Sequence, residues 1–311
     1  MLRLCAAALC ASLVSNAAPA ANASPGDQVQ PAKPGPATPA DTSPVKLLVG
    51  APLGADRAKG DADRLAALLT TALQRPVTGV VVPDSEISDA LSAGKGDFAW
   101  LSAMQYVRSA AQPQGSKAQA GAGVAPVAQL LRGGLPFYRS VLFTRKGTKI
   151  VTPADLKSKL LAFVREDSAA GYLLPRQTLL ASGLTDAELK KFGSFYGDHA
   201  AVCAAVADGK VAAGATVSND RAGLSIAGCQ ETLGERASEL KVISTSDPIP
   251  NDVIAVRPGY PAEGYAALRA ALLGLAATEE GKKLLADVFH GDGFSPSDDA
   301  DFALLRETLK R

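Results

Sequence analysis

The chain has 311 residues, a formal net charge of +1 and 47% hydrophobic residues, enough to bury one large core or two smaller ones. The near-neutral charge argues against nucleic-acid binding, because no basic excess exists to neutralise the phosphates of a polymer. No run of about 20 apolar residues lies outside the N-terminus, so we expect no spanning helix.

Residues 1–23 have the pattern of a signal peptide. Arg3 supplies the positive charge, residues 4–14 are apolar, and 21–23 (Ala-Asn-Ala) fit the small-x-small cleavage pattern. We therefore expect export to the periplasm and a mature chain that starts at Ser24. An uncleaved N-terminal anchor is the alternative. A lipid anchor at Cys10 is disfavoured, because Leu9 and not a small residue precedes it.

Residues 24–44 are rich in Pro, Ala and polar residues and lack large apolar side chains. Such a segment cannot bury enough surface to fold, so we interpret it as a disordered linker. Export leaves two cysteines, Cys203 and Cys229, in an oxidising compartment. They form either a disulfide or two buried free thiols, and the sequence leaves both possibilities open.

Strands and helices alternate along the rest of the chain. The first half predicts strands and helices in the order 45–52 (strand), 61–74 (helix), 76–83 (strand), 85–95 (helix), 96–102 (strand), 103–112 (helix) and 123–132 (strand). The pattern restarts with a strand at 138–147, a helix and a strand over 152–164, and a helix that ends at about 182. The elements predicted next are 186–192 (helix), 193–198 (strand), 199–210 (helix), 211–218 (strand) and 239–259 (two strands). Helices over 263–289 and 299–310 close the chain. This alternation predicts an α/β fold with parallel strands and helices on both faces.

Both halves carry a helix that ends at Gly-Lys before a strand of small and apolar residues, in "SAGKGDFAWLS" and "ADGKVAAGATVS". We therefore expect two similar lobes, with the end of the chain returning to complete the first. Ligands in such units bind outside the carboxyl ends of the strands. The cleft is then expected around 50–53, 83–85, 102–106, 167–172, 197–199 and 218–220.

Four segments resemble blocks of one family, the periplasmic phosphonate-, phosphite- and phosphate-binding proteins of ABC importers. They are "DFAWLSAMQYV", "YRSVLFTRKGTKIVTPADLKSKLLAFVREDSAAGYLLPR", "YGDHAAVCAAVADGKVAAG" and "SDPIPNDVIAVRPGYP", and they occur in family order within residues 45–310. The resemblance implies a type II-like clamshell with mixed, mainly parallel sheets and crossovers near 137–141 and 245–253. Lobe 1 is then 45–138 with 251–311, and lobe 2 is 139–250.

The resemblance places the anion at Ser168, Ala169, Ala170 and Gly171, where a helix begins. Helix N-termini supply free amides and a partial positive charge, and small side chains let an anion approach the backbone. In the family this turn is usually rich in Ser and Thr, so here the backbone amides must do more of the binding. An ordinary capped helix is the alternative.

Six further residues are candidates for the opposite side of the cleft or for its rim. Ser102 is a hydroxyl donor or a plain N-cap, and Tyr106 matches a family position that faces the cleft or is a half-buried aromatic residue. His199 follows Gly-Asp, where the family often has histidine, but it also fits the first turn of a helix capped by Asp198. Polar or cationic substituents are assigned to Asp84, Ser85 and Asn219, which otherwise form turns.

No metal or cofactor pattern is visible: two separated histidines and no Cys-x-x-Cys give no zinc site. We expect a monomeric solute-binding protein, not an enzyme, that delivers a phosphorus oxyanion to an inner-membrane ABC permease. A sensory module for a membrane receptor is the alternative. A hydrolase using Ser168, His199 and Asp198 ranks last, because no Gly-x-Ser-x-Gly elbow supports it.

Overall fold

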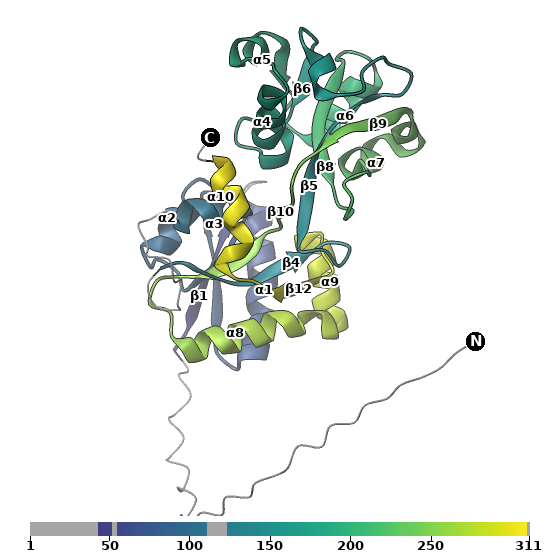
Figure 1. Cartoon of the computed structure of the whole chain (residues 1–311). Helices are drawn as coiled ribbons and strands as arrows, with labels where there is room; N and C mark the ends of the chain where they lie inside the picture. The colour runs from purple at the N-terminus through teal and green to yellow at the C-terminus, as the bar shows by residue number, and fades with distance from the viewer. Residues whose placement is uncertain (1–42, 52–54, 111–122, 310–311) are drawn as a thin grey trace, which may run out of the picture. The chain divides into compact units, whose positions relative to one another are not determined.

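The computed structural model of the chain describes residues 43–51, 55–110 and 123–309 (Figure 1). The expected signal peptide and all but the last two residues of the expected linker lie outside these ranges. Both sheets of the fold belong to one compact unit, Asp41–Arg311. Within the described residues no helix has the length and apolar character needed to cross a bilayer.

The first sheet has six strands and is built from both ends of this unit. Its order is β12 (Gly293–Pro296), β4 (Ala125–Leu131), β11 (Val253–Val256), β3 (Phe98–Leu101), β1 (Val45–Gly50) and β2 (Val77–Val82). Its helices are α1 (Ala55–Leu73), α2 (Ile87–Ser92), α3 (Ala103–Ala110), α8 (Ala262–Gly274), α9 (Glu279–Phe289) and α10 (Ala303–Leu309), with 3₁₀ turns at Leu275–Ala277 and Asp299–Phe302.

The second sheet also has six strands. Its order is β10 (Ile249–Pro250), β5 (Phe137–Arg145), β8 (Ala213–Ser218), β6 (Leu161–Phe163) and β7 (Gly193–Phe195), and β9 (Leu240–Thr245) also pairs with β5. Around it lie α4 (Leu174–Ala181), α5 (Asp186–Phe192), α6 (His199–Ala207) and α7 (Ala227–Leu233), with 3₁₀ turns at Pro153–Leu156 and Gly234–Glu239. A π-helical turn, Ala169–Leu173, precedes α4.

The expected two mixed sheets flanked by helices are confirmed, but parallel pairing is less extensive than expected. It joins β1 to β2 and β3, and β6 to β7 and β8, which are the strands linked by helices. The other described pairs are antiparallel. The reason is topological: strands that return from a crossover or from the chain end enter each sheet in the opposite direction.

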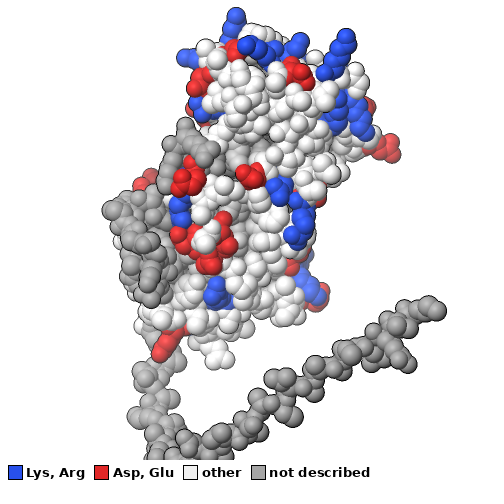
Figure 2. Space-filling view, in the orientation of Figure 1, with Lys and Arg blue, Asp and Glu red and all other residues white. Residues whose placement is uncertain are grey.

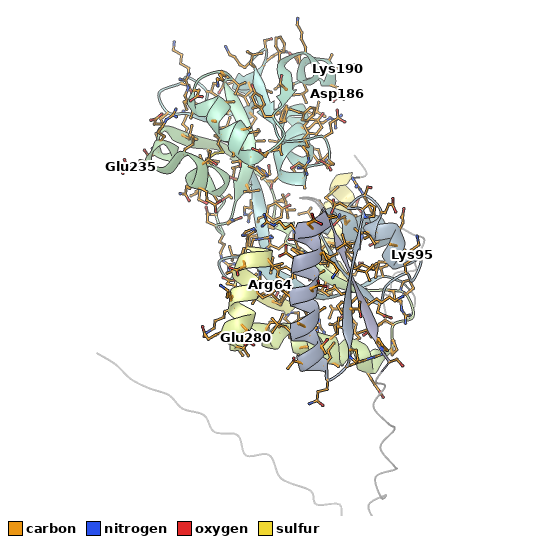
Figure 3. The ribbon with its side chains drawn as sticks, turned by 180° about the vertical axis from the view of Figure 1, so that it is seen from behind. Arg64, Lys95, Asp186, Lys190, Glu235 and Glu280 are labelled. Carbon is orange, nitrogen blue, oxygen red and sulfur yellow. A yellow bond between two sulfur atoms is a disulfide. The ribbon has the colours of Figure 1, made fainter. Side chains whose placement is uncertain are left out.

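Successive side chains of the strands point to opposite faces of the first sheet, and apolar residues pack on both faces. Leu47 and Val49 of β1 pack against α1, α8 and α9, while Leu48 between them packs on the opposite face with α2 and α3. Arg64 of α1 also donates to Asp287 of α9 at 3.0 Å, and these two helices lie side by side (Figure 3). The helices thus hold the carboxyl ends of the parallel strands in fixed positions.

The chain passes between the sheets twice, after β4 and after β10, and Asn251 ties the two passages together. Its fully buried side-chain amide donates to the carbonyl oxygens of Leu130 (3.0 Å) and Leu135 (2.9 Å). Arg132 donates to the Asn251 Oδ1 at 3.1 Å and to Asp252 at 2.8 Å. A buried amide with these partners fixes the backbone where the chain changes sheets.

Charged side chains are spread over the surface of the fold. Figure 2 shows Lys and Arg interspersed with Asp and Glu on the visible face, in keeping with the net charge of +1. The described residues of the visible surface therefore offer no patch of one charge for a ligand. We look for the binding site in a pocket, where a few charged residues act at short range.

Candidate functional site

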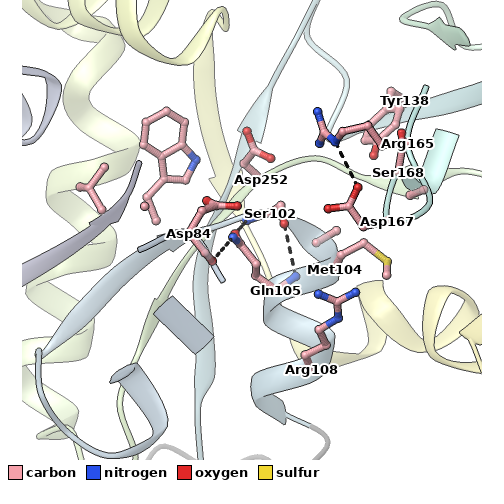
Figure 4. Close-up of a pocket in the computed structure, with 15 residues that line it drawn as sticks. Asp84, Ser102, Met104, Gln105, Arg108, Tyr138, Arg165, Asp167, Ser168 and Asp252 are labelled. Carbon is pink, nitrogen blue, oxygen red and sulfur yellow. Dashed lines mark hydrogen bonds and ion pairs between the residues drawn. The ribbon is translucent and has the colours of Figure 1, made fainter. Parts of the chain in front are cut away.

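A pocket of about 320 Å³, which we call the central pocket, lies at the carboxyl ends of β1, β3 and β6 (Figure 4). It brings together residues of both sheets and of the second passage between them. Its lining residues are Val49, Gly50, Asp84, Trp100, Ser102, Ala103, Met104, Gln105, Arg108, Tyr138, Arg165, Asp167, Ser168, Ala169 and Asp252. Strand ends are where α/β sheets bind ligands, and the volume is within the range typical of such sites, about 300–1,000 Å³.

The second sheet contributes the turn that follows β6. Ser168 adopts an extended backbone conformation and its Oγ accepts a hydrogen bond from the amide of Gly171 at 3.0 Å. In an α-helix the Gly171 carbonyl would accept from residue 175, but Pro175 has no N–H. The amide of Val164 donates to that carbonyl instead, at 3.2 Å. Pro175 thus leaves the Gly171 carbonyl free to accept from Val164, within the π-helical turn that precedes α4.

The backbone amides of Ala169 and Ala170 make no hydrogen bond to any other described residue, which is usual for the first amides of a helix. Ala169 lines the central pocket, and its methyl group leaves room beside the backbone. Ser140 of β5 donates to the Ala170 carbonyl at 2.7 Å and thereby fixes the turn to the sheet. The turn is therefore joined to the sheet by this bond and has two backbone amides without a partner among the described residues.

The first sheet contributes the start of α3. Ser102 and Gln105 cap this helix reciprocally: the Ser102 amide donates to the Gln105 Oε1 at 2.8 Å, and the Gln105 amide donates to the Ser102 Oγ at 3.3 Å. Gln105 Nε2 also donates to the carbonyl oxygen of Asp84 at 3.1 Å. The Ser102 hydroxyl donates to no described residue, so its proton remains available to a ligand.

Two arginines, Arg108 and Arg165, line the pocket together with three aspartates, Asp84, Asp167 and Asp252. Arg165 forms an ion pair with Asp167 at 3.1 Å, and both side chains are well exposed. Arg108, one turn after Met104 on α3, has no ion pair within the described part of the chain. Of the two, Arg108 therefore carries the charge that is less compensated.

Tyr138, at the start of β5, adds a hydroxyl group. Burial raises the pKa of Tyr138, and the carboxylate of Asp252 raises it further, so the phenol keeps its proton at neutral pH. The hydroxyl makes no hydrogen bond to another described residue. It is therefore a donor that faces the pocket lined by Arg165 and Ser168 (Figure 4).

Sequence reasoning did not select Arg108, Tyr138 or Arg165. Arg165 follows a buried strand directly, so the strand-end rule applied to 167–172 would have included it if extended by two residues. Arg108 shares a helix face with Met104 through the i, i+4 spacing. For Tyr138 the sequence contains no such signal, because its place depends on the passage between the sheets.

The structure brings four of the sequence-selected residues to the central pocket: Ser102, Asp84, Ser168 and Ala169. Ala170 is buried in the core, and the amide of Gly171 is used within the turn by Ser168. These two shape the turn without lining the pocket.

Tyr106 lies in the core instead of facing the cleft. It is fully buried, its hydroxyl donates to Asp299 at 2.6 Å, and its ring packs on Phe302 with centroids 4.3 Å apart. Burial and the neighbouring carboxylate raise the pKa of Tyr106, so this hydroxyl stays protonated. Arg306 pairs with Asp299 and covers the ring, which joins α10 to α3. The family position thus serves packing here.

The other three candidates also lie outside the central pocket lining. His199 Nδ1 is 3.0 Å from the hydroxyl of Thr216, and burial, aided by the charge of Arg165, lowers the pKa of the imidazole. Asn219 and Ser85 are exposed on loops. The expected clusters at 197–199 and 218–220 therefore follow strand ends without reaching the pocket in this structure.

A disulfide joins Cys203 of α6 to Cys229 of α7, with an S–S distance of 2.06 Å. Both cysteines are fully buried beneath the second sheet. Within the described residues, no group of three or more His, Cys, Asp or Glu side chains is arranged to hold a metal ion.

The family model for the phosphonate periplasmic substrate-binding proteins of ABC transporters matches residues 54–302. The chain belongs to this family. Members of this family are periplasmic substrate-binding proteins of ABC transporters, which agrees with a pocket lined by residues of both sheets.

Solved structures share the fold at low sequence identity. A Xanthomonas citri protein bound to ATP matches with a TM-score of 0.65 and 20% identity, covering 86% of this chain and 98% of that one. A binding-protein component of a Pseudomonas aeruginosa phosphonate ABC transporter gives 0.60 and 23%, covering 86% of each chain. The PhnD1 protein of Prochlorococcus marinus in complex with methylphosphonate gives 0.63 and 17%, covering 87% and 98%. At these identities the likeness establishes the type II-like fold.

Proposed function

We propose that this protein captures a phosphorus oxyanion, a phosphonate, phosphite or phosphate, in the central pocket. The observation that carries the proposal is the meeting of the Ser168–Ala169 turn of one sheet with the start of α3 of the other. A tetrahedral oxyanion needs several convergent N–H and O–H donors and little bulk. The uncommitted amides of the turn, with the hydroxyls of Ser102 and Tyr138, supply them.

Electrostatics favour an anion on the side of the pocket formed by the turn. Two helical segments present the positive ends of their dipoles. Arg108 adds a charge without an ion pair in the described residues, and the charge of Arg165 is partly offset by Asp167. The small side chain of Ala169 lets the anion approach the backbone. Family membership supports the same ligand class, and the likeness to a protein solved with methylphosphonate fits it.

Ligand contacts from both sheets would stabilise a closed arrangement over an open one, because a ligand shifts a conformational equilibrium by its differential affinity. The two passages joined by Asn251 are the only described segments through which the chain runs between the sheets, so closure would pivot there. The closed, monomeric, periplasmic protein would then deliver its anion to an inner-membrane ABC permease.

A ligand screen by thermal denaturation tests this function. Protein purified from the periplasm is heated with methylphosphonate, phosphite, phosphate, sulfate or arsenate. We expect a phosphorus anion to raise the Tm, since a ligand at 100 times its Kd stabilises the native state by about 2.7 kcal/mol. An unchanged Tm with every phosphorus anion would contradict the proposal.

The variant Ala169→Asp locates the site. It places a carboxylate beside the proposed anion, and we expect it to abolish the Tm response. Ala187→Asp is the matched control, because Ala187 is exposed in the first turn of α5, outside the central pocket lining. Circular dichroism verifies that both variants fold. An Ala169→Asp protein that binds its anion with unchanged affinity would refute the placement.

A further inference from the structure

A second cavity, of about 220 Å³, adjoins the central pocket and is not used by the proposed anion site; we call it the side cavity. The two cavities share four lining residues: Val49, Gly50, Trp100 and Asp252. The side cavity then extends between the start of α1 and the end of α9. The side cavity is therefore the neighbour of the central pocket, with Gly50 and Trp100 lining both.

Charges at the side cavity are already neutralised. Arg132 donates to Asp252 at 2.8 Å, to the Asn251 Oδ1 at 3.1 Å and to the Phe289 carbonyl at 3.3 Å. Arg57, which is more exposed, lies 3.9 Å from Asp61 one turn along α1. With each cation beside a carboxylate, this cavity is not a second seat for an anion.

Apart from these ion-paired residues and His290, the side-cavity lining is apolar and aromatic. Ala58 and Val288 are buried, and the ring of Phe289 packs on the half-buried indole of Trp100 with centroids 4.1 Å apart. Concave surfaces of this kind bind uncharged organic groups, and an aromatic ring gains additionally from an offset or edge contact.

The end of the central pocket next to the side cavity carries a negative charge, that of Asp84. In Figure 4, Asp84 lies on the far side of Ser102 from Arg165 and Ser168. Its carboxylate packs against Gly50, where an added Cβ would come within 2.5 Å of the Asp84 Oδ1. A negative group at this end disfavours the phosphonate oxygens there, so the anion is directed to the turn and the substituent to Gly50 and Trp100.

We infer that the ligand is an organophosphonate whose uncharged, preferably aromatic substituent runs past Gly50 and Trp100 into the side cavity. The inference rests on the proposed function and narrows it. Phosphite and phosphate have no group that would fill this space, and a methyl group is too short to reach it. The substrate class is therefore the aryl- or arylalkylphosphonates.

Isothermal titration with methyl-, phenyl- and benzylphosphonate tests the inference on the unmodified protein. The anionic group is constant, so differences report the substituent. We expect benzylphosphonate to bind at least about tenfold more tightly than methylphosphonate, because burying apolar surface contributes about 25 cal/mol per Å². Benzylphosphonate binding no tighter than methylphosphonate would overturn the inference.

Fluorescence gives a second readout that needs no substitution, because Trp100 is the single tryptophan of the sequence. A nitroaromatic ring quenches an indole that it contacts. We expect 4-nitrobenzylphosphonate to quench the Trp100 emission in a saturable titration and methylphosphonate to leave most of it. Saturable binding of the nitro compound without quenching would place its ring elsewhere.

Ala58→Leu fills the side cavity without touching the central pocket lining. It should remove the advantage of benzylphosphonate and leave the Kd for methylphosphonate within about threefold. Ala67→Leu is the matched control, because it makes the same change on the exposed face of α1. Equal weakening of both ligands by Ala58→Leu would count against the side cavity as the seat of the ring.

The two proposals fail in different ways. If no phosphorus anion binds, the proposed function itself is wrong and the inference falls with it. If methylphosphonate binds and Ala169→Asp abolishes that binding, but the aromatic ligands gain nothing, the anion site stands and only the side-cavity inference is refuted.

Discussion

The two turns that meet at the central pocket satisfy their backbones in different ways. At the start of α3, the side chains of Ser102 and Gln105 cap each other's backbone amides. At the start of the π-helical turn, Ser168 caps a single amide, that of Gly171, and a second strand holds the turn through Ser140. Two of its own side chains cap the first turn reciprocally. The second turn is capped at one amide and is also fixed by the hydrogen bond from Ser140 of β5.

The comparison indicates that the start of α3 supplies side-chain groups to the pocket and that the turn after Ser168 supplies backbone donors. The first turn offers a hydroxyl and, through Arg108, a charge. The second offers a backbone amide at Ala169, which lines the pocket and has only a methyl side chain. Small residues at a helix start gain a binding role only when the surrounding structure holds the turn in place.

The largest expected effect comes from Gly171→Ala. A Cβ at this position would lie 2.4 Å from the Val164 Cγ2 and 2.8 Å from the Ser168 Oγ, so the turn must move. We expect a loss of about 1–3 kcal/mol in stability, as in other overpacked cores, together with loss of anion binding. Urea unfolding and calorimetric titration measure the two effects.

Gly60→Ala is its control, because a Cβ at Gly60 in α1 meets nothing within 4 Å. Replacing a helical glycine by alanine stabilises by about 0.5–1 kcal/mol, so this variant should shift the urea midpoint upward. If the Gly171→Ala protein were as stable as the unmodified protein, the close packing of Gly171 against Val164 and Ser168 would not be needed for stability.

Arg108 and Arg165 test the charge on each side. Arg165 is offset by Asp167, whereas Arg108 has no ion pair in the described chain. Removing a hydrogen bond to a charged group costs about 1.5–3 kcal/mol, so Arg108→Gln should raise the Kd for the anion about tenfold or more. Arg165→Gln should have a smaller effect, about threefold, and the difference should shrink at high salt.

The control for both is Arg64→Gln, which removes an exposed α1 to α9 ion pair outside the central pocket lining. It should leave the Kd unchanged. A larger loss from Arg165→Gln than from Arg108→Gln would reverse the assignment of charge to the two turns.

Much of the fold could be predicted from the sequence, because the local patterns of apolar and small residues determine where strands and helices alternate along the chain. The strands at 45–50, 77–82 and 98–101 fall within their expected ranges, and the helix after Ser168 ends at Ala181. The predominance of antiparallel pairs was not expected. It depends on which strands return from the crossovers, and that is a long-range property with no local signal.

The candidate site could be predicted only where it depends on strand ends. Ser102, Asp84 and Ser168 follow strands and reach the pocket. The family resemblance selects Tyr106 and His199. In the structure Tyr106 donates to Asp299, 193 residues along the chain, and His199 Nδ1 lies 3.0 Å from the Thr216 hydroxyl of β8. A side chain with two possible partners cannot be assigned from its own neighbourhood in the chain.

Paired serine substitutions sharpen the comparison of the two caps. Ser168→Ala removes the sole side-chain partner of the Gly171 amide and should cost about 1 kcal/mol of stability, as is typical of a lost N-cap. Ser102→Ala should cost less, because the Gln105 side chain still caps the Ser102 amide and the lost bond is long, at 3.3 Å. Urea midpoints of the two proteins decide it, and equal losses would mean that the caps are equivalent.

The smallest expected effect concerns His199, at the start of α6. Burial and the nearby charge of Arg165 lower the pKa of His199 in the folded protein, while Asp198 opposes them. The unfolded chain therefore binds the proton first, at an ordinary histidine pKa of about 6.5, and stability is full above this pH and falls below it. Urea midpoints at pH 7.5, 6.5 and 5.5 should decline in that order. His199→Gln should flatten the decline, and Arg165→Gln should reduce it, because one cause of the depressed pKa is gone. An unchanged slope in the His199→Gln protein would show that another group, not His199, titrates in this range.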